Sequence, residues 1–283
     1  MPELAYVNGR TMPIEAAMVP IEDRGYQFSD SVYEVIATYH GRLFLLERHL
    51  DRLQKSMLDL AFPPLSRDRL RDAILELQQQ AGFDRAAVYV QISRGVAPRN
   101  HPFPHQATPQ IVMTVRQVPE IPPESVREGI RAITVDDIRW KRCDIKTVQL
   151  LPNVLAKQQA LDAGARDAIF ISAEGVVREA TASNLFIRSG DRLRTHPLTP
   201  AILPGITRAV LIEICRERGI GVDEDFFNEQ EMMAADEVML TGTLTEVLPV
   251  TRINDRIIDK GLPGTMAREL KSLLEQRAKT DAV

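Results

Sequence analysis

Short strand-like segments alternate with amphipathic helices along this chain, and a proline-rich stretch, PEIPPES at residues 119–125, interrupts the alternation. Proline cannot continue a central strand or the interior of a helix, so the stretch predicts a domain boundary. Domains commonly contain about 100 to 200 residues, which allows one on each side. We therefore expect two α/β domains, with an N-terminal domain at 1–118, a linker at 119–124 and a C-terminal domain at 125–283.

Local patterns define the elements of the first domain. Two hairpins are predicted, with turns at Asn8-Gly9 and His40-Gly41. The next segment is predicted to be a helix, because apolar residues recur at the four-then-three spacing of one buried face. These residues are Leu46, Leu50, Leu53 and Met57. A second helix, RDRLRDAILELQQQAG, is predicted to end at Gly82.

Charge and composition exclude several classes of partner. A formal net charge of -4 leaves no general basic surface for nucleic acid or an anionic membrane. No segment has the roughly 18 consecutive apolar residues that span a bilayer, and MPELAYVNGRTMPIEAAMVP lacks the pattern of a secretory signal. We expect a cytoplasmic protein. Its two cysteines, Cys143 and Cys215, indicate neither a disulfide framework nor a zinc site.

Several common site motifs are absent from the sequence. It contains no GxGxxG, no GxxxxGK(S/T) and no GxSxG, so a dinucleotide fold, a P-loop and a serine-hydrolase elbow have no sequence support. His101 and His105 are four residues apart, but Pro102 and Pro104 prevent the helix that would align them on a metal ion. We therefore expect no metal site.

A lysine-containing segment, DIRWKRCDIKTVQLLPNVLAKQQA at residues 137–160, carries the first candidate for catalysis. Lysines in the amphipathic helices fit solvated positions, which leaves Lys141 and Lys146. We expect Lys146 at the end of a buried strand, where an ammonium group needs a specific reason to be present. Such a lysine can act as a neutral amine and form a Schiff base with a carbonyl. The alternative is a surface lysine paired with Asp137 or Asp144.

If that carbonyl belongs to pyridoxal 5'-phosphate (PLP), the site also needs an acid at the pyridine nitrogen and a cradle for the phosphate. Glu179 lies in VVREATASNLF among small and apolar residues, so it needs a cationic or hydrogen-bonded partner. A structural salt bridge to an arginine is the alternative role. In LPGITRAVL, Gly205 precedes Ile206 and Thr207 at a predicted helix start, where free N–H groups and a hydroxyl bind anions. An ordinary capped helix is the alternative there.

Taken together, the motifs resemble the fold-type IV PLP enzymes and, within them, the D-amino acid aminotransferases. The similarity follows the family's order along nearly the whole chain. Besides the lysine segment, it is specific at EDRGYQFSDSVYEV, HLDRL, SRGVAPRNHPFP, REATASNLF, ILPGITR and TGTLTEVLPV. The resemblance implies an α/β (α+β) fold with a smaller N-terminal α/β domain and a larger C-terminal α/β pseudo-barrel domain.

The resemblance also implies the cofactor PLP and a role for each matching residue. Lys146 corresponds to the lysine that holds PLP as an internal aldimine and moves a proton between Cα and C4′. Glu179 corresponds to the carboxylate that keeps the pyridine nitrogen protonated. The other implied contacts are Leu203 at the ring and Arg52, Ile206, Thr207 and Thr243 around the phosphate.

Tyr33, Arg99 and His101 resemble the group that binds the substrate carboxylate in D-amino acid aminotransferases, where the arginine and histidine come from the neighbouring subunit. A guanidinium can bind a carboxylate through two hydrogen bonds, while a hydroxyl and an imidazole orient it. The resemblance thus implies a homodimer with its active site at the subunit interface. Its implied reaction is ping-pong transfer from a D-amino acid, such as D-alanine, to a 2-oxo acid, such as 2-oxoglutarate. From the residues alone, APRNHPFP also fits a solvated loop.

Two positions depart from the family pattern. Ser31 stands where the family often has glycine, and it would restrict the backbone or narrow the pocket beside Tyr33. Gly242 stands where some relatives carry a hydroxyl, which removes one possible phosphate contact. Four alternatives remain: a branched-chain L-amino acid aminotransferase, an (R)-amine transaminase, an aminodeoxychorismate lyase and a non-catalytic PLP-binding protein. The PRNH sequence argues against the first two.

Overall fold

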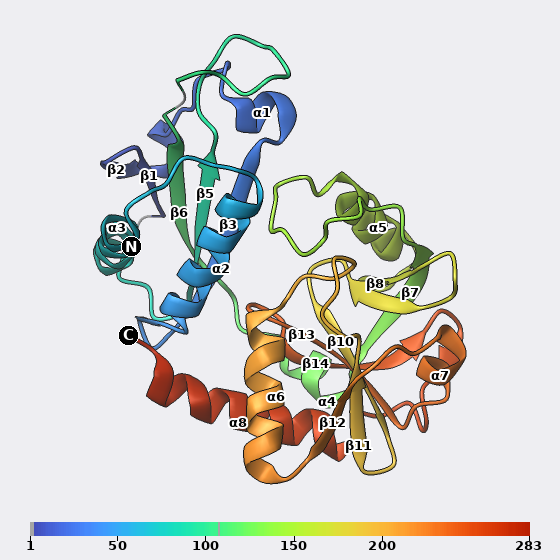
Figure 1. Ribbon diagram of the computed structural model, residues 1–283. Coiled ribbons are helices and arrows are strands. Elements are labelled where there is room, and N and C mark those ends of the chain that lie inside the picture. The colour runs from blue at the N-terminus through green and yellow to red at the C-terminus, as the bar shows by residue number, and fades with distance from the viewer. Residues whose placement is uncertain (1–2, 107) are drawn as a thin grey trace. The chain divides into compact units, whose positions relative to one another are not determined.

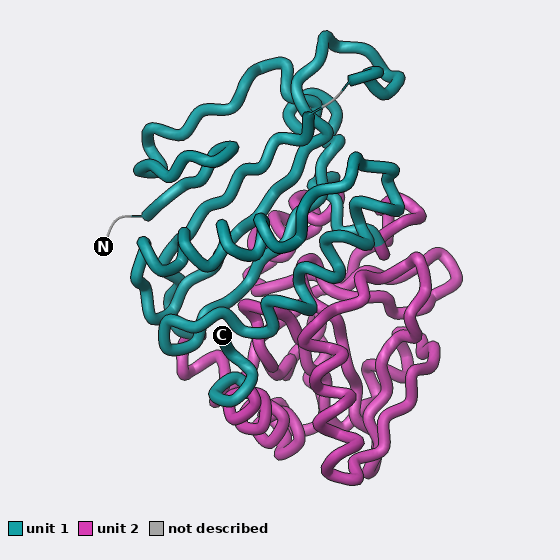
Figure 2. The backbone as a smooth tube through the Cα atoms, turned by 60° about the vertical axis from the view of Figure 1, so that its left-hand side comes forward, with its two compact units in different colours: residues 1–120, 145–149, 278–283 teal, residues 121–144, 150–277 magenta. Residues whose placement is uncertain are grey.

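The computed structural model describes residues 3–106 and 108–283 (Figure 1). It divides into two compact units, which Figure 2 distinguishes by colour. The first unit comprises the chain up to Glu120 together with Ile145–Gln149 and Ala278–Val283, and the second comprises Ile121–Asp144 and Leu150–Arg277. The expected linker at 119–124 stays a prediction.

Two segments that we expected in the C-terminal domain, Ile145–Gln149 and Ala278–Val283, belong to the first unit. Backbone pairing explains the difference, because Thr147 forms a bridge with Val32, and Ala282 forms one with Phe44. Both bridges join positions far apart in the chain. Local periodicity therefore carries no signal for them.

The described residues of the first unit form a six-stranded antiparallel sheet with the order β2-β1-β6-β5-β3-β4. Its strands are β1 (Leu4–Val7), β2 (Arg10–Pro13), β3 (Ser31–Tyr39), β4 (Arg42–Leu43), β5 (Ala86–Ser93) and β6 (Gln110–Gln117). Its helical segments are η1 (Ile14–Ala16), α1 (Arg24–Phe28), α2 (Leu46–Asp59) and α3 (Arg67–Ala81). Both predicted hairpins are confirmed, since β1 pairs with β2 and β3 with β4.

Helices α2 and α3 cover one face of this sheet (Figure 1). The predicted buried side of α2 is confirmed, because Leu46, Leu50 and Leu53 are each 1% exposed and Met57 is 5% exposed. Helix α3 ends as predicted at Gly82, whose φ of 68° is in the left-handed region that favours glycine. The face of the sheet that α2 and α3 cover thus carries the core of this unit.

In the second unit, all of which is described, nine strands form a mixed sheet with the order β12-β11-β10-β13-β14-β7-β8-β9, and β15 pairs with β14. The strands are β7 (Ile130–Asp136), β8 (Asp167–Ile171), β9 (Val177–Ala180), β10 (Asn184–Ser189), β11 (Arg192–Thr195), β12 (Gly221–Glu224), β13 (Glu237–Gly242), β14 (Glu246–Ile253) and β15 (Arg256–Ile257). One apolar cluster draws on β7 to β10, β13 and β14. A sheet whose strands share one core must curve around it, as the predicted pseudo-barrel requires.

Helices complete the second unit. They are α4 (Pro123–Arg127), α5 (Leu151–Asp162), α6 (Ile206–Arg218), α7 (Glu229–Met233) and α8 (Thr265–Asp281), the last turn of which belongs to the first unit. Helix α5 packs on β7 and β8 through small side chains, Ala156 and Ala160. Helix α6 packs on β13, which brings its first turn to the same sheet as Glu179. In the part of the chain that the structure describes, no helix is both long and apolar enough to span a membrane.

Candidate active site

Lys146 lies in the first unit, on a loop and not at the end of a strand as we expected. Strand β7 already ends at Asp136, and the returning chain runs beside the start of β3. The Tyr33 N–H donates to the Lys146 carbonyl at 3.0 Å, and the Lys146 N–H donates to Ser56 Oγ at 3.3 Å. The expectation was wrong because the backbone partner of this segment is distant in sequence.

The Lys146 ammonium lies against an aromatic ring. Its Nζ is 4.3 Å from the centroid of Tyr33. Among the described residues of the first unit, Nζ forms no hydrogen bond or ion pair. Asp137 and Asp144, the partners in the alternative role, form ion pairs with Arg139 and Arg142. The geometry thus provides a lysine whose amine is not committed to a carboxylate of its own unit.

A buried acid fixes Arg52. Glu34, 1% exposed, accepts hydrogen bonds from Arg52 Nε at 2.7 Å and Nη2 at 2.8 Å, and contacts His49 Nδ1 at 2.7 Å. Burial raises the pKa of Glu34, but Arg52 and His49 outweigh it and lower the pKa to about 2. An ionised carboxylate can only accept, so Nδ1 of His49 carries the proton. Arg52 is therefore not an ordinary exposed helix arginine, since its side chain is 10% exposed and its orientation is set by Glu34.

Burial also lowers the pKa of His49, although the Glu34 carboxylate raises it. The imidazole is therefore neutral near pH 7 and acts as a hydrogen-bond donor to Glu34.

Tyr33 lies in β3, where it pairs with Gln91 of β5. Its ring is 5.6 Å from that of Tyr89, whose hydroxyl donates to Gln91 Oε1 at 2.8 Å. Gln91 Nε2 in turn donates to Ser31 Oγ at 3.2 Å. Ser31 is completely buried and has no positive φ, so the backbone restriction expected for a glycine replacement does not arise. A Cβ on Gly25 would lie 2.2 Å from Ser31 Oγ, so no side chain fits at position 25 while Ser31 keeps this position.

Arg99 and His101 lie on the exposed loop between β5 and β6. The Arg99 guanidinium carbon is 5.0 Å from the centroid of Phe28, and the rings of His101 and Phe28 are 5.5 Å apart. Among the described residues of this single chain, neither side chain forms a hydrogen bond, ion pair or ring contact with Tyr33. The loop therefore places Arg99 and His101, the two predicted carboxylate ligands, against the same ring, that of Phe28.

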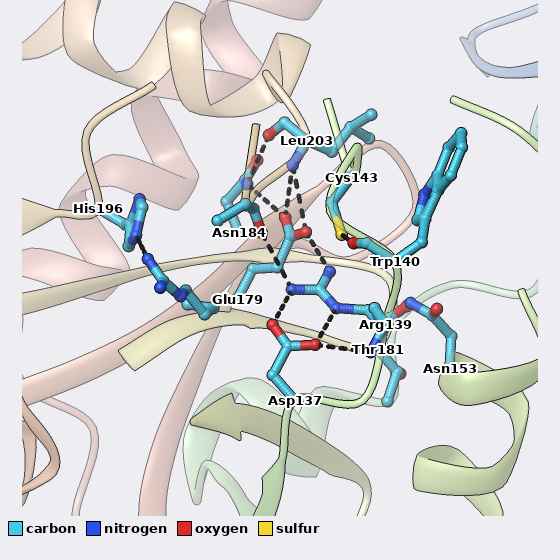
Figure 3. Close-up of polar contacts among 12 residues, drawn as sticks. Asp137, Arg139, Trp140, Cys143, Asn153, Glu179, Thr181, Asn184, His196 and Leu203 are labelled. Carbon is cyan, nitrogen blue, oxygen red and sulfur yellow. Dashed lines mark hydrogen bonds and ion pairs between the residues drawn. The ribbon is translucent and has the colours of Figure 1, made fainter. Parts of the chain in front are cut away.

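Glu179 is the third residue of β9 in the second unit and is 5% exposed. Its carboxylate accepts from Arg139 Nη1 at 2.5 Å, from Asn184 Nδ2 at 3.0 Å and from the Leu203 N–H at 3.1 Å (Figure 3). The predicted need for a partner is confirmed. The arginine partner of the alternative role is also present, so the salt bridge alone leaves the role of Glu179 open.

Arg139 is shared between two acids (Figure 3). It donates to Asp137 through Nε and Nη2, both at 2.9 Å, and to Glu179 through Nη1. Burial lowers the pKa of Arg139, but Asp137 and Glu179 raise it by more, so the guanidinium stays charged. Two carboxylates around one guanidinium leave a net charge of about -1, which favours a cationic group beside them.

The start of α6 has no side-chain cap. Gly205 is the N-cap residue, and a Cβ there would lie 1.9 Å from Asn184 Oδ1. Asn184 Nδ2 also donates to the Leu203 carbonyl at 2.9 Å, so one amide links Glu179, the Leu203 loop and the helix start. The predicted helix start is confirmed. The alternative, an ordinary capped helix, is wrong, because no side chain caps the N–H groups of the first turn. Ile206 and Thr207, 8% and 6% exposed, occupy its first turn.

Thr243 follows β13 in the second unit. A Cβ on the preceding Gly242 would lie 3.3 Å from both the Ala182 carbonyl oxygen and Ser183 Oγ. Ser183 Oγ and Thr245 Oγ1 are 2.9 Å apart. Hydroxyl groups from two turns therefore gather beside Gly242, which itself contributes none.

Four residues around the site were not predicted from the sequence: Glu34, His49, Arg139 and Asn184. Glu34 carried a usable signal, because it is an acid in the middle of the apolar strand SVYEVIATY. Arg139 and Asn184 carried no sequence signal that distinguished them from other arginines and asparagines. Their shared partner is Glu179, which lies 40 residues from Arg139 and 5 residues from Asn184.

The chain belongs to the class IV aminotransferases: the family model described as "Amino-transferase class IV" matches residues 31–253. The predicted family is thereby confirmed, and the sheets and helices described above agree with the predicted α/β fold.

Individual relatives narrow the comparison. The chain is 41% identical over 282 residues to a D-alanine aminotransferase of Bacillus licheniformis, covering 96% of this chain and 98% of that protein. Its fold is similar to a branched-chain amino acid aminotransferase of Escherichia coli, with a TM-score of 0.91 at 23% identity, over 98% of this chain and 94% of that one. The holo, PLP-form branched-chain aminotransferase of Thermobaculum terrenum matches with a TM-score of 0.85 at 25% identity, over 99% and 95%.

Proposed function

We propose that the protein is a PLP-dependent aminotransferase that moves the amino group of a D-amino acid, such as D-alanine, to a 2-oxo acid, such as 2-oxoglutarate, by a ping-pong mechanism. The observation that carries the proposal is the 41% identity to a D-alanine aminotransferase over 96% of the chain. The branched-chain aminotransferases match the fold at lower identity, 23% and 25% in the two cases above. Branched-chain L-amino acid transamination is therefore the second candidate.

The residues present fit the chemistry of PLP. When bound, PLP supplies an aldehyde that reacts with amines and a ring that accepts the electrons left at Cα after deprotonation. The net charge of about -1 on Asp137, Arg139 and Glu179 suits a protonated pyridine nitrogen. The uncapped start of α6 suits a phosphate, because its free N–H groups and the helix dipole attract anions.

Each residue of the proposed site has a separate role toward the cofactor. In our proposal, Lys146 holds the cofactor covalently through Nζ and later carries the proton between Cα and C4′. Glu179 would keep the pyridine nitrogen protonated. Leu203, whose N–H donates a hydrogen bond to the Glu179 carboxylate, would pack on the ring. The proposed phosphate ligands are Arg52, Ile206, Thr207 and Thr243. Glu34 supports this set by fixing Arg52.

Substrate selectivity is assigned to Tyr33, Arg99 and His101. We propose that Arg99 and His101 bind the substrate carboxylate from the partner subunit of a homodimer, and that the enzyme works in the cytoplasm. Their exposure in the single chain supports this arrangement, because an exposed loop can reach a neighbour.

Replacing Arg99 with alanine is expected to lower kcat/KM for D-amino acids about 10- to 100-fold. The loss corresponds to one charge-assisted contact of about 1.5 to 3 kcal/mol. Steady-state kinetics with D-alanine and with a primary (R)-amine, which has no carboxylate, measure it. The amine should be affected much less, and the cofactor spectrum should stay normal.

Subunit mixing tests whether Arg99 acts across the interface. A heterodimer of an Arg99→Ala chain and a Lys146→Ala chain keeps one intact composite site if Arg99 acts in trans and none if it acts in cis. Asn100→Ala, whose side chain has no assigned role, is the matched loop control. No activity in verified heterodimers contradicts the shared site, and equal losses for D-alanine and the amine contradict the carboxylate role.

A further inference from the structure

The loop that carries Arg99 and His101 is exposed, yet its backbone is held from beneath by one arginine. Arg24 donates from Nη1 to the Asn100 carbonyl at 2.6 Å and from Nη2 to the His101 carbonyl at 3.2 Å. A longer contact, 3.4 Å, joins Nη1 to the Pro102 carbonyl. Arg24 itself is only 3% exposed. One buried guanidinium therefore satisfies consecutive carbonyl groups within residues 99–103, which we term the 99–103 loop.

The guanidinium of Arg24 is itself fixed from behind. Its Nε donates to Asp30 Oδ2 at 2.8 Å, and the same oxygen accepts from Arg94 Nε at 2.8 Å. Arg94 donates to the carbonyls of Leu60 and Ala61 at 2.8 and 3.0 Å, just beyond the end of α2. The contacts of Arg24 with the loop are thus tied through Asp30 and Arg94 to the scaffold of the first unit.

Aromatic contacts extend the same arrangement to the loop's side chains. The Arg24 guanidinium carbon is 4.9 Å from the Phe28 centroid, and Arg99 and His101 contact the same ring. Arg94 lies 3.7 Å from the centroid of Phe103, at the end of the loop. In cation–π contacts of this kind, the face of the ring attracts the guanidinium group and so limits the positions of both side chains.

The segment that leads into the 99–103 loop, residues 95–97, is also fixed. The Arg24 N–H donates to the Gly95 carbonyl at 3.0 Å, and the Ala97 N–H donates to the Glu22 carbonyl at 3.2 Å. Gly95 has a φ of 117°, and a Cβ there would lie 2.3 Å from the Thr108 carbonyl oxygen. Only glycine fits this close approach, so the backbone enters the 99–103 loop from a fixed position at Gly95. Between these anchored ends, Arg24 is the side chain that holds the backbone carrying Arg99 and His101.

We propose that Arg24 is a positioning residue that sets the enzyme's preference for substrates with an α-carboxylate. It touches no substrate; it acts by holding the backbone of residues 100–102 in one conformation, so that Arg99 and His101 are presented together. The inference rests on the proposed function of Arg99 and His101. Without Arg24, binding a carboxylate must order the loop each time, and that entropic cost weakens binding.

The chemistry of the contacts requires arginine. A guanidinium offers five N–H donors in a planar fork, which lets Nε bind Asp30 while the terminal nitrogens bind carbonyls on the loop. A lysine ammonium provides the charge but not this divided geometry. Arg24→Lys should therefore behave like Arg24→Met in selectivity, although it keeps the charge.

The test compares D-alanine with D-alaninamide, which share Cα but differ in the carboxylate. For Arg24→Met and Arg24→Lys holoenzymes, KM for D-alanine should rise about tenfold while kcat stays within about twofold. Kinetics with D-alaninamide should stay within about twofold of the parent. Amide hydrogen exchange in residues 96–106 should accelerate, whereas exchange in β3 and β5 should not. Arg85→Met, which removes a guanidinium stacked on Tyr39, is the matched control and should change neither readout.

Arg99→Ala, measured in parallel, distinguishes a failure of the positioning role of Arg24 from a failure of the proposed carboxylate binding by Arg99 and His101. If Arg99→Ala discriminates between the two substrates and both Arg24 variants do not, only the positioning role is overturned. If Arg99→Ala fails to discriminate, the carboxylate role of the loop is overturned and the inference falls with it. Equal losses on both substrates with unchanged exchange in 96–106 also overturn the inference. If Arg24→Met does not fold, Arg24→Lys decides the matter by the same two readouts.

Discussion

Lys146→Ala should lower turnover by more than about 10⁴-fold while the fold survives. The substitution removes the amine proposed to bind the cofactor and to move the proton. It leaves the backbone contacts of Lys146 with Tyr33 and Ser56, which hold the segment in the first unit. No ion pair within that unit is lost, so a melting temperature close to that of the parent is expected.

Chemical trapping identifies the lysine directly. Borohydride reduction of the parent holoenzyme, followed by peptide mass analysis, should place the cofactor on Lys146. Lys141→Ala, at an exposed position five residues earlier, is the control and should keep full activity. A label on Lys141 or Lys157 contradicts the assignment.

Glu179→Gln is expected to slow proton abstraction at Cα by about 10²- to 10³-fold. The amide keeps nearly the same shape, and its oxygen can still accept from the Leu203 N–H. However, the substitution removes the negative charge of the carboxylate proposed to contact the pyridine nitrogen, and with it the preference for a protonated nitrogen. The rate of a single turnover with D-alanine should therefore fall far more than the affinity for PLP.

Asp137→Asn provides a comparison for Glu179. It removes the other carboxylate on Arg139 and makes the same change in net charge, but it leaves the carboxylate of Glu179, which is the group proposed to contact the pyridine nitrogen. Its effect on the single-turnover rate should be less than about tenfold. Unchanged single-turnover rates in Glu179→Gln would show that Glu179 is only a structural acid.

Local features of the fold could be predicted from the sequence because their causes are local. The buried face of α2 follows from the spacing of Leu46, Leu50 and Leu53, and the end of α3 follows from Gly82. The start of α6 at Gly205 was predictable for the same reason. These elements depend on neighbours within a few positions of the chain.

The surroundings of the candidate site depend on distant residues and could not be predicted in this way. Lys146 was placed wrongly because its segment pairs with β3, more than 100 positions earlier. Arg24 bonds to carbonyls 76 and 77 positions away, which no periodicity records. The resemblance to a family supplied residue identities and roles, whereas the hydrogen bonds that fix Arg52 and the 99–103 loop required coordinates.

Transamination of D-amino acids can be followed in the absorption spectrum of the purified holoenzyme after addition of one substrate at a time. With D-alanine and no oxo acid, we expect conversion of the cofactor to the pyridoxamine form with release of pyruvate, and return to the PLP form when 2-oxoglutarate is added. L-alanine should cause little or no conversion on the same timescale. Conversion by L-amino acids in preference to D-alanine, or a spectrum that no amino acid changes, would contradict the proposed function.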